Sequence, residues 1–277
     1  QFVLASHDNY ELTDQRVVEQ AFNNEWKGVD AVIHAAASVG GIKLNLDAPV
    51  KQYRDNILMN TFVTDAAFRY GVKKFIAFSS VCAFPAEAKL LNGDNLHDGV
   101  PFKDHFYYSM AKRMQDVQIG SLREEYGLKG YMSLIPCNVY GKFDNFNLDV
   151  GHVVPSLIRK LYESKQQKKP LNVWGSGRAM REFIYSKDLA KIALALLKKD
   201  ELPQRMVVPG VEKSIKEIVE LLCSAAQCYD VEYDLAKPEG QHRRPSDARQ
   251  FRTLFPIFTF SDLQESLAET YKWFVLT

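Results

Sequence analysis

The sequence has few cysteines, almost no net charge and no long apolar run, and each absence excludes a class of protein. Its four cysteines form no CxxC pair, so no structural zinc or other metal site is predicted. Four reduced thiols are typical of a cytoplasmic protein, which is the localisation we expect. A formal net charge of +1 creates no field that favours nucleic acid, and no run approaches the roughly 18 apolar residues of a membrane span. We therefore expect neither a nucleic-acid partner nor a membrane.

What is present is the composition of an ordinary globular protein. Hydrophobic residues make up 46% of the 277 residues and charged residues 25%. This length allows one large or two modest domains. We place a boundary near residue 150, with a larger domain over 1–150 and a smaller mixed α/β region over 151–277. The second region could return one element to the sheet of the first.

Short apolar runs alternate with longer helical patterns in the first half of the chain. Near-continuous apolar strands separated by helices are typical of a parallel sheet buried on both faces. The predicted fold class is therefore α/β, a Rossmann-like doubly wound parallel sheet. We expect strands at 2–4, 30–36, 74–80 and 131–136, and helices at 14–22, 50–70 and 107–126.

The second half has a looser pattern. Ser214 is followed three residues later by Glu217, the spacing of a capping box at the start of a helix. A basic turn is expected at 241–244. The remaining expected elements are helices at 153–163, 188–199, 214–226 and 261–274 and short strands at 171–174 and 183–185.

In parallel sheets ligands bind beyond the carboxyl ends of the strands. Three short segments follow the predicted strands at that edge, namely 35–37, 79–80 and 137–138. We therefore expect one shared site there.

Five residues carry groups suited to carbonyl chemistry, namely Ser80, Cys82, Tyr108, Lys112 and His152. Tyr108 and Lys112 are four residues apart, so they share one face of a helix. A nearby ammonium is expected to lower the pKa of the phenol from its ordinary value near ~10. A serine hydroxyl can orient a substrate oxygen at the same point. This set predicts proton transfer coupled to hydride transfer.

Each of these residues also has a purely structural interpretation. Tyr108 and Lys112 could be an ordinary helix pair, and Cys82 a small buried hydrophobic residue. His152 could make a backbone hydrogen bond at a helix start. Trp174 could serve packing alone, and Arg244 could belong to a solvated turn.

Several local motifs together point to one family. They lie at 36–42, 80–85, 108–114, 144–147, 151–155, 174–177 and 181–183, and include Val-Gly-Gly-Ile, Asp-Asn-Phe and Gly-His-Val. In this order the sequence resembles the GDP-L-fucose synthase family of extended short-chain dehydrogenases/reductases. The resemblance extends over the whole chain.

The resemblance implies a two-step reaction. The family epimerises GDP-4-keto-6-deoxy-D-mannose at C3 and C5, then reduces the C4 ketone with NADPH to give GDP-L-fucose. Cys82 matches the family's base and His152 its acid. Ser80 and Tyr108 match the groups that bind the C4 oxygen, and Lys112 the partner of the tyrosine.

The resemblance also implies binding residues and an assembly. The cofactor would be bound by the first domain, at His7, Ala35, Ala36, Asn56, Tyr108 and Lys112. The substrate would be bound at Asn138, Trp174, Arg181 and Arg244, with the two arginines at the diphosphate. Family members form homodimers through the helices that correspond here to 50–70 and 107–126.

The sequence departs from the family in two places. No G-x-x-G-x-x-G loop occurs, and residue 1 matches the family's second strand. We expect a longer protein rather than a truncated form, because losing a central strand would expose apolar surface on its neighbours. His7 stands about where a basic residue would bind the 2′-phosphate of the cofactor, and Asp8 follows it. We still expect NADPH rather than NADH.

Two other functions remain open on sequence grounds. One is an epimerase or reductase acting on a different GDP-4-keto sugar, such as a heptose. The other is a non-catalytic paralogue that acts as a structural or regulatory partner, which the missing glycine loop suggests.

Overall fold

Residues 2–237 and 242–277 are described by the computed structural model, so position 241 of the predicted basic turn lies outside the described residues. The chain forms two units. The first contains Gln1–Glu87, Asn92–Pro136 and Ile192–Val207, and the second contains Ala88–Leu91, Cys137–Lys191 and Val208–Thr277. The chain leaves the first unit after Pro136 and returns at Ile192, whereas the sequence-based boundary was placed near residue 150.

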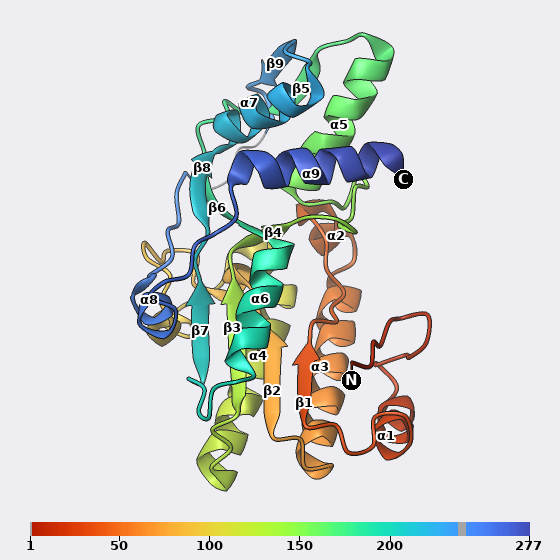
Figure 1. Ribbon diagram of the computed structural model, residues 1–277, viewed down its shortest axis with the longest axis vertical. Helices are drawn as coiled ribbons and strands as arrows, with labels where there is room; N and C mark the ends of the chain where they lie inside the picture. The colour runs from red at the N-terminus through yellow and green to blue at the C-terminus, as the bar shows by residue number, and fades with distance from the viewer. Residues whose placement is uncertain (1, 238–241) are drawn as a thin grey trace. The chain divides into compact units, whose positions relative to one another are not determined.

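The first unit is built on a four-stranded sheet in the order β1-β2-β3-β7 (Figure 1). Its strands are β1 (Ala31–His34), β2 (Lys74–Phe78), β3 (Tyr131–Pro136) and β7 (Arg205–Val208). β1 pairs in parallel with β2, and β2 pairs in parallel with β3. All six residues of β3 are buried. The predicted buried parallel sheet is therefore confirmed, and the last strand is supplied from beyond residue 150.

The helices of the first unit are α1 (Gln15–Asn23), α2 (Ile42–Asp47), α3 (Pro49–Arg69) and α4 (Phe106–Tyr126), with short 3-10 turns η1 (Val81–Ala83), η2 (Gly93–Asn95) and η3 (Lys103–His105). Three of these helices, α1, α3 and α4, begin and end within one residue of the predicted bounds, whereas the short helix α2 was not predicted. Asp14 caps α1 by accepting a hydrogen bond from the Arg16 backbone N–H. α4 ends at Gly127, whose φ of 66° suits glycine. α3 and α4 pack against each other.

Aromatic and small side chains fill the core of the first unit. Phe22, Trp26, Phe75 and Tyr131 are buried there together with small alanines of α3. Phe75 and Tyr131 stack across neighbouring strands, with ring centroids 5.3 Å apart. This core holds α1 and α3 on the sheet and so fixes the carboxyl ends of β1 and β2.

The strand predicted at 2–4 is wrong. Phe2 and Leu4 are 78% and 88% exposed and their backbone has no strand conformation. A strand requires a neighbour that pairs with its N–H and C=O groups. In the described part of the chain β1 is the edge of the sheet and pairs only with β2. An apolar run alone therefore does not make a strand here.

The second unit has two small sheets. The first has the order β4-β6-β8, with β4 (Asn138–Tyr140), β6 (Met180–Tyr185) and β8 (Val211–Ser214), and the second pairs β5 (Leu171–Trp174) with β9 (Val231–Asp234). Its helices are α5 (Val153–Gln167), α7 (Ile215–Ala226), α8 (Arg249–Leu254) and α9 (Leu263–Leu276), while α6 (Ser186–Leu196) continues into the first unit. The predicted capping box is confirmed: Ser214 and Glu217 bond reciprocally at the start of α7.

The second unit has its own apolar core. α5, α7 and α9 contribute Leu157, Leu161, Ile218, Leu222 and Leu267, among others. No helix among the described residues is long and apolar enough to cross a membrane.

Candidate active site

The carboxyl end of β2 and the first turns of α4 bring together four of the five predicted catalytic residues. Ser80 directly precedes the turn η1, which follows β2, and Cys82 lies in that turn. Tyr108 and Lys112 lie on α4, and the Lys112 ammonium is 6.0 Å from the centre of the Tyr108 ring. A hydrogen bond joins the side chains of Ser80 and Tyr108. The four residues belong to one unit, so this grouping follows directly from the fold.

Tyr108 is only 7% exposed, and this burial decides the state of its phenol. Burial raises the pKa of Tyr108 well above its ordinary value of 10, and the charge of a Cys82 thiolate raises it further. The hydrogen bond with Ser80 acts in the opposite direction. The expected lowering of this pKa is therefore not seen in the structure: desolvation dominates, and Lys112 is not among the groups that shift the Tyr108 pKa. Tyr108 is a protonated acid at neutral pH.

Lys112 is also almost completely buried. Its Nζ donates a hydrogen bond of 2.8 Å to the Phe78 carbonyl at the end of β2. Burial lowers the pKa of Lys112 from 10.5 to about 8. The amine therefore changes charge about one pH unit above neutrality. An ordinary surface helix pair would show none of these features.

Cys82 lies in the turn η1, and the side chain of Ser80 caps that turn. The Ser80 Oγ accepts a hydrogen bond of 3.2 Å from the Cys82 backbone N–H. Cys82 is partly exposed, whereas Cys137 and Cys223 are buried. The interpretation of Cys82 as a buried hydrophobic residue is therefore wrong.

A buried histidine lies behind this group. His34, the last residue of β1, is 4% exposed, and its Nε2 is 3.0 Å from the Asn60 side-chain oxygen. Burial, together with the smaller effect of the positive charge of Lys112, lowers the pKa of His34 from 6.5 to about 4. His34 is neutral in the folded protein at neutral pH.

This neutral histidine predicts a specific loss of stability in acid. Between pH 6.5 and 4 the unfolded chain binds a proton at position 34 that the folded chain does not bind, so stability falls as pH falls. The contribution is about 3 kcal/mol, and it is fully lost below pH 4. In His34→Gln this contribution is absent, while a hydrogen-bonding partner for Asn60 remains. Urea unfolding at pH 7, 5 and 4 should therefore show a smaller loss for the variant. Parallel losses would contradict the assignment.

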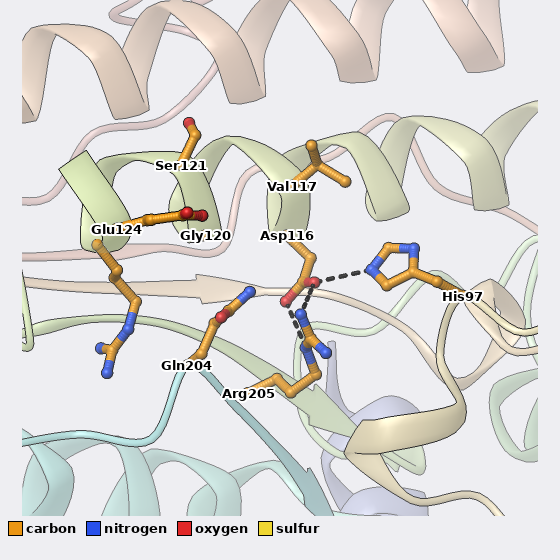
Figure 2. Close-up of a pocket in the computed structure, with 9 residues that line it drawn as sticks. His97, Asp116, Val117, Gly120, Ser121, Glu124, Gln204 and Arg205 are labelled. Carbon is orange, nitrogen blue, oxygen red and sulfur yellow. Dashed lines mark hydrogen bonds and ion pairs between the residues drawn. The ribbon is translucent and has the colours of Figure 1, made fainter.

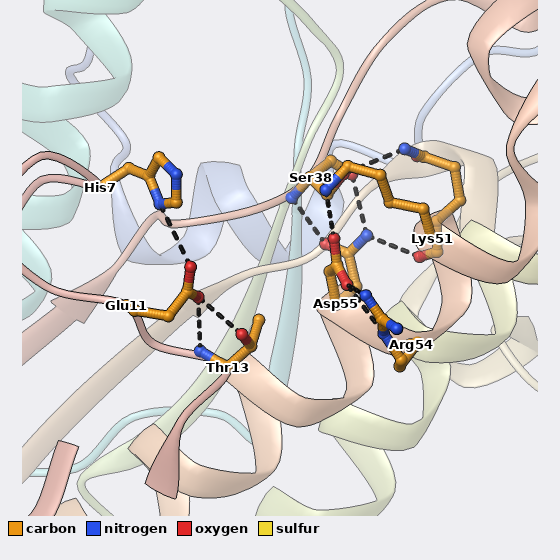
Figure 3. A network of polar contacts seen from close by, with 9 residues as sticks. His7, Glu11, Thr13, Ser38, Lys51, Arg54 and Asp55 are labelled. Atoms are coloured by element: carbon orange, nitrogen blue, oxygen red, sulfur yellow. Dashed lines mark hydrogen bonds and ion pairs between the residues drawn. The ribbon is translucent and has the colours of Figure 1, made fainter. Parts of the chain in front are cut away.

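Two alanines and a buried asparagine stand at the carboxyl end of β1. Ala35 and Ala36 directly follow the strand. The Asn56 Oδ1 accepts a hydrogen bond of 3.1 Å from the Ser38 N–H, and its Nδ2 donates to the Ser38 and Gln52 carbonyls at 2.8 and 2.7 Å. Asn56 thus closes the loop after β1 onto α3, and Figure 3 shows Ser38 beside that helix. The role of Asn56, Ala35 and Ala36 at the cofactor stays a prediction.

His7 has different surroundings. Its Nδ1 is 3.8 Å from a Glu11 carboxylate oxygen, and its side chain is 85% exposed (Figure 3). A carboxylate partner competes with any phosphate for this imidazole. The role of His7 at the 2′-phosphate stays a prediction.

The predicted substrate residues belong to the second unit. The Asn138 Nδ2 donates a hydrogen bond of 2.8 Å to the Glu182 carbonyl, and Arg181 NH1 donates to the Met180 carbonyl at 2.7 Å. Asn138 on β4 and Arg181 on β6 therefore lie on paired strands. Arg244 is half-buried.

Trp174 is 52% exposed at the end of β5, so it does not serve packing alone. Lys160 and Lys237 place their ammonium groups 4.7 and 5.5 Å from its ring centre. The two cations and the indole form a surface suited to a planar, anionic ligand.

His152 directly precedes α5 and is exposed. His152 is the N-cap residue of this helix: its side chain makes no capping hydrogen bond, and its backbone carbonyl accepts a hydrogen bond of 3.0 Å from the Ser156 N–H. The role of His152 as the acid stays a prediction. Gly151 determines how it is presented: a Cβ at Gly151 would lie 2.5 Å from the Asn145 carbonyl oxygen and 2.6 Å from that of Asn147. Only glycine allows the loop to close this tightly. The carboxylate of Asp144 interacts electrostatically with His152.

Comparison with known proteins identifies the family. Residues 5–208 match the NAD dependent epimerase/dehydratase family. A probable GDP-L-fucose synthase of Drosophila melanogaster is 30% identical over 99% of this chain and 88% of its own length. The GDP-L-fucose synthase of Dictyostelium discoideum is 34% identical over 88% of this chain and 78% of its own.

The chain belongs to the NAD dependent epimerase/dehydratase family. The crystal structure of a GDP-L-fucose synthetase from Naegleria fowleri bound to NADP superposes with a TM-score of 0.93 and 30% identity, covering 100% of this chain and 85% of that one. The resemblance to GDP-L-fucose synthases and the Rossmann-like fold are therefore confirmed.

In this member of the epimerase/dehydratase family, the sequence interpretation missed three residues next to the predicted group. Ser109 and Arg113 bond to the turn that carries Cys82, and His105 bonds to the Ser109 hydroxyl. Ser109 and Arg113 each directly follow a predicted catalytic residue and are themselves four residues apart. That repeated spacing was the available signal.

A separate cavity of about 540 Å³ contains none of the predicted residues (Figure 2). Its most buried group is Asp116, whose carboxylate bonds Arg205 at 2.7 Å and His97 at 2.9 Å. These charges are satisfied by one another, so we interpret the cluster as a link between α4 and β7. Across the described residues no group of His, Cys, Asp or Glu side chains could hold a metal ion.

Proposed function

We propose that this chain is a GDP-L-fucose synthase, which epimerises GDP-4-keto-6-deoxy-D-mannose at C3 and C5 and then reduces its C4 ketone with NADPH. The observation that carries the proposal is the grouping of Ser80, Cys82, Tyr108 and Lys112 at the carboxyl end of β2. Cys82 can act as a base, Ser80 and Tyr108 can donate hydrogen bonds to a substrate oxygen, and Lys112 can carry a positive charge. Together these groups suit both reaction steps. The GDP-L-fucose synthases among its relatives support the same reaction.

The residues present fit a nicotinamide cofactor. The Ser79 Oγ is buried and has no hydrogen-bond partner among the described residues. It lies at the same strand end as Tyr108 and Lys112, which would hold the nicotinamide ribose, while Ala35, Ala36 and Asn56 shape the neighbouring strand end. When bound, NADPH supplies the hydride for C4.

In the epimerisation step Cys82 acts as the base. Hydrogens on the carbons next to a ketone are acidic because the resulting electron pair spreads onto the carbonyl oxygen. The Cys82 thiolate takes the proton from C3 or C5, and the negative charge passes to the C4 oxygen. Ser80 and Tyr108 donate hydrogen bonds to that oxygen and stabilise it. His152 returns a proton from the opposite face, which inverts the carbon.

In the reduction step Tyr108 acts as the acid. The C4 oxygen becomes an alkoxide as the carbon is reduced, and Tyr108 gives it a proton. The resulting phenolate is stabilised by the Lys112 ammonium on the same helix face. A lysine whose pKa is about 8 then passes on a proton more readily than an ordinary one. Burial keeps water away from both groups.

The second unit would bind the GDP end of the substrate. We assign Arg181 and Arg244 to the diphosphate, because guanidinium groups match pairs of phosphate oxygens. Asn138 and Trp174 would contact the rest of the nucleotide sugar. These assignments rest on the family resemblance and, for Asn138, Trp174 and Arg181, on their placement on β4, β5 and β6.

A direct assay tests the proposed function. The full-length protein is incubated with GDP-4-keto-6-deoxy-D-mannose and NADPH, absorbance is followed at 340 nm, and the product is identified by chromatography. We expect NADPH oxidation together with GDP-L-fucose. Oxidation with only an unepimerised product would mean a simple reductase. No oxidation, and no exchange of substrate hydrogens with solvent, would overturn the enzyme function.

We also propose a homodimer in the cytoplasm. α3 and α4 pack side by side and expose Val50, Tyr53, Tyr107 and Val117 by 41% to 73%. Apolar side chains on two neighbouring helices suit a second copy of the same pair. None of the four cysteines forms a disulfide, which fits a reducing compartment. Sedimentation equilibrium should give twice the chain mass.

A further inference from the structure

The helix α4 carries two pairs of buried polar residues side by side. Tyr108 and Lys112 form the first pair, and Ser109 and Arg113 form the second, each with the spacing that aligns side chains on a helix. Ser109 is fully buried and Arg113 is 5% exposed. Burial of an arginine and a serine is costly unless their polar groups are hydrogen-bonded, so the bonds that these two side chains make are informative.

Ser109 bonds the main chain of Cys82. Its hydroxyl donates a hydrogen bond of 2.9 Å to the Cys82 carbonyl. The His105 Nδ1 lies 2.9 Å from the same hydroxyl oxygen. A serine hydroxyl has one proton, and that proton is used on Cys82, so the His105 Nδ1 must be the donor to Ser109. His105 therefore orients the serine toward Cys82.

Arg113 holds the next residue of the same turn. Its Nε donates to the Ala83 carbonyl at 2.6 Å, and its NH1 donates to the Gly99 carbonyl at 2.6 Å. Lys112 already donates to the Phe78 carbonyl at the end of β2. α4 thus holds the chain at the end of β2, at Cys82 and at the end of η1.

We propose that Ser109, oriented by His105, is a positioning residue that sets the place of the Cys82 thiol for proton abstraction. This inference rests on the proposed function, because it assigns a partner to its base. Ser109 does not touch the reacting atoms, and it acts through the Cys82 main chain. The Arg113 bonds keep the turn attached to α4 when Ser109 is altered.

The two reaction steps should depend on Ser109 to different degrees. The Cys82 sulfur is one carbon away from the main chain, so a shift of the turn moves the sulfur by a similar distance. Tyr108 and Lys112 are on α4 itself, so their positions depend far less on that turn. Displacing a reacting group by about 1 Å costs on the order of 10²-fold in rate. Loss of Ser109 should therefore slow epimerisation far more than reduction.

Ser109→Ala in the full-length enzyme tests this separation. Epimerisation is measured as solvent deuterium uptake by the ketosugar, and reduction as NADPH oxidation on substrate already equilibrated by the wild-type enzyme, which is then removed. We expect deuterium uptake to fall about 10- to 100-fold and reduction to change less than about threefold. Ser109→Thr, which keeps the hydroxyl, should recover uptake. Ser121→Ala, at an exposed position of the same helix, should change neither rate.

His105→Gln provides a second, milder change for the case that Ser109→Ala fails to fold. His105→Gln should also lower deuterium uptake by the ketosugar, again with little effect on the rate of reduction. Equal losses in both steps, or unchanged uptake in the folded variants, would overturn the positioning role. Absence of uptake in the wild-type enzyme would instead overturn the proposed function, so the two failures are distinguishable.

Discussion

Tyr108→Phe should lower the rate of ketone reduction by about 10²- to 10⁴-fold, the usual contribution of a positioned general acid. Burial raises the pKa of the Tyr108 phenol, so the group reaches the reaction carrying the proton that the alkoxide needs. Phenylalanine keeps the buried ring at this position of α4 but removes that proton. The measurement is single-turnover NADPH oxidation with saturating substrate.

Tyr107→Phe is the matched control for this change. Tyr107 is the neighbouring residue on α4 and is 51% exposed, so removing its hydroxyl should leave the rate unchanged. Deuterium uptake by Tyr108→Phe should fall much less than reduction, because Ser80 still donates to the C4 oxygen. Reduction at more than about a tenth of the wild-type rate would show that another group supplies the proton.

Cys82→Ser should abolish most epimerisation, with solvent deuterium uptake reduced about 10²- to 10⁴-fold. The hydroxyl has nearly the shape of the thiol but ionises far less readily, so it is a poor base near neutral pH. Reduction of substrate already equilibrated by the wild-type enzyme should persist, because Tyr108 and Lys112 are intact. The turn should also persist, because the Ser80 and Ser109 bonds involve only the main chain of residue 82.

The control for the cysteine change is Cys228→Ser. Cys228 is also partly exposed, but it lies in the second unit after α7. The Cys228→Ser variant should retain both epimerisation and reduction. Normal deuterium uptake by Cys82→Ser would rule out the thiol as the base and would leave the turn η1 without a catalytic role.

The sequence alone predicted those parts of the fold that depend on local pattern. β2, β3 and α4 were expected within one or two residues of their observed ends, because apolar runs, Gly127 and the packing face of α4 are local signals. The capping box at Ser214 was equally local. The segments that follow the predicted strands also indicated a candidate site at the carboxyl ends of the strands, where the structure groups Ser80, Cys82, Tyr108 and Lys112.

What the sequence could not predict depends on distant contacts and on burial. The apolar run Phe2–Leu4 resembles a strand in sequence, but a strand forms only where its backbone pairs with a neighbouring strand. The direction of the Tyr108 pKa shift depends on desolvation, which no motif encodes. The bonds from Ser109 and Arg113 connect residues 27 and 30 positions apart, so helical spacing marked a second pair without naming its target.

These bonds also change the meaning of the Tyr108–Lys112 motif. In the proposed mechanism, α4 supplies the acid of the reduction directly and positions the base of the epimerisation through Ser109. One helix therefore sets the geometry of both steps. This arrangement explains physically why a chain that carries out two reactions could keep both sets of groups in register.

The most direct test of the central claim is the deuterium content of the sugar formed from GDP-4-keto-6-deoxy-D-mannose and NADPH in D₂O. If one group of residues performs both steps, mass spectrometry will show solvent deuterium at C3 and at C5 of the reduced product, formed in proportion to the NADPH consumed. A reduced product without solvent deuterium at these carbons would contradict the claim.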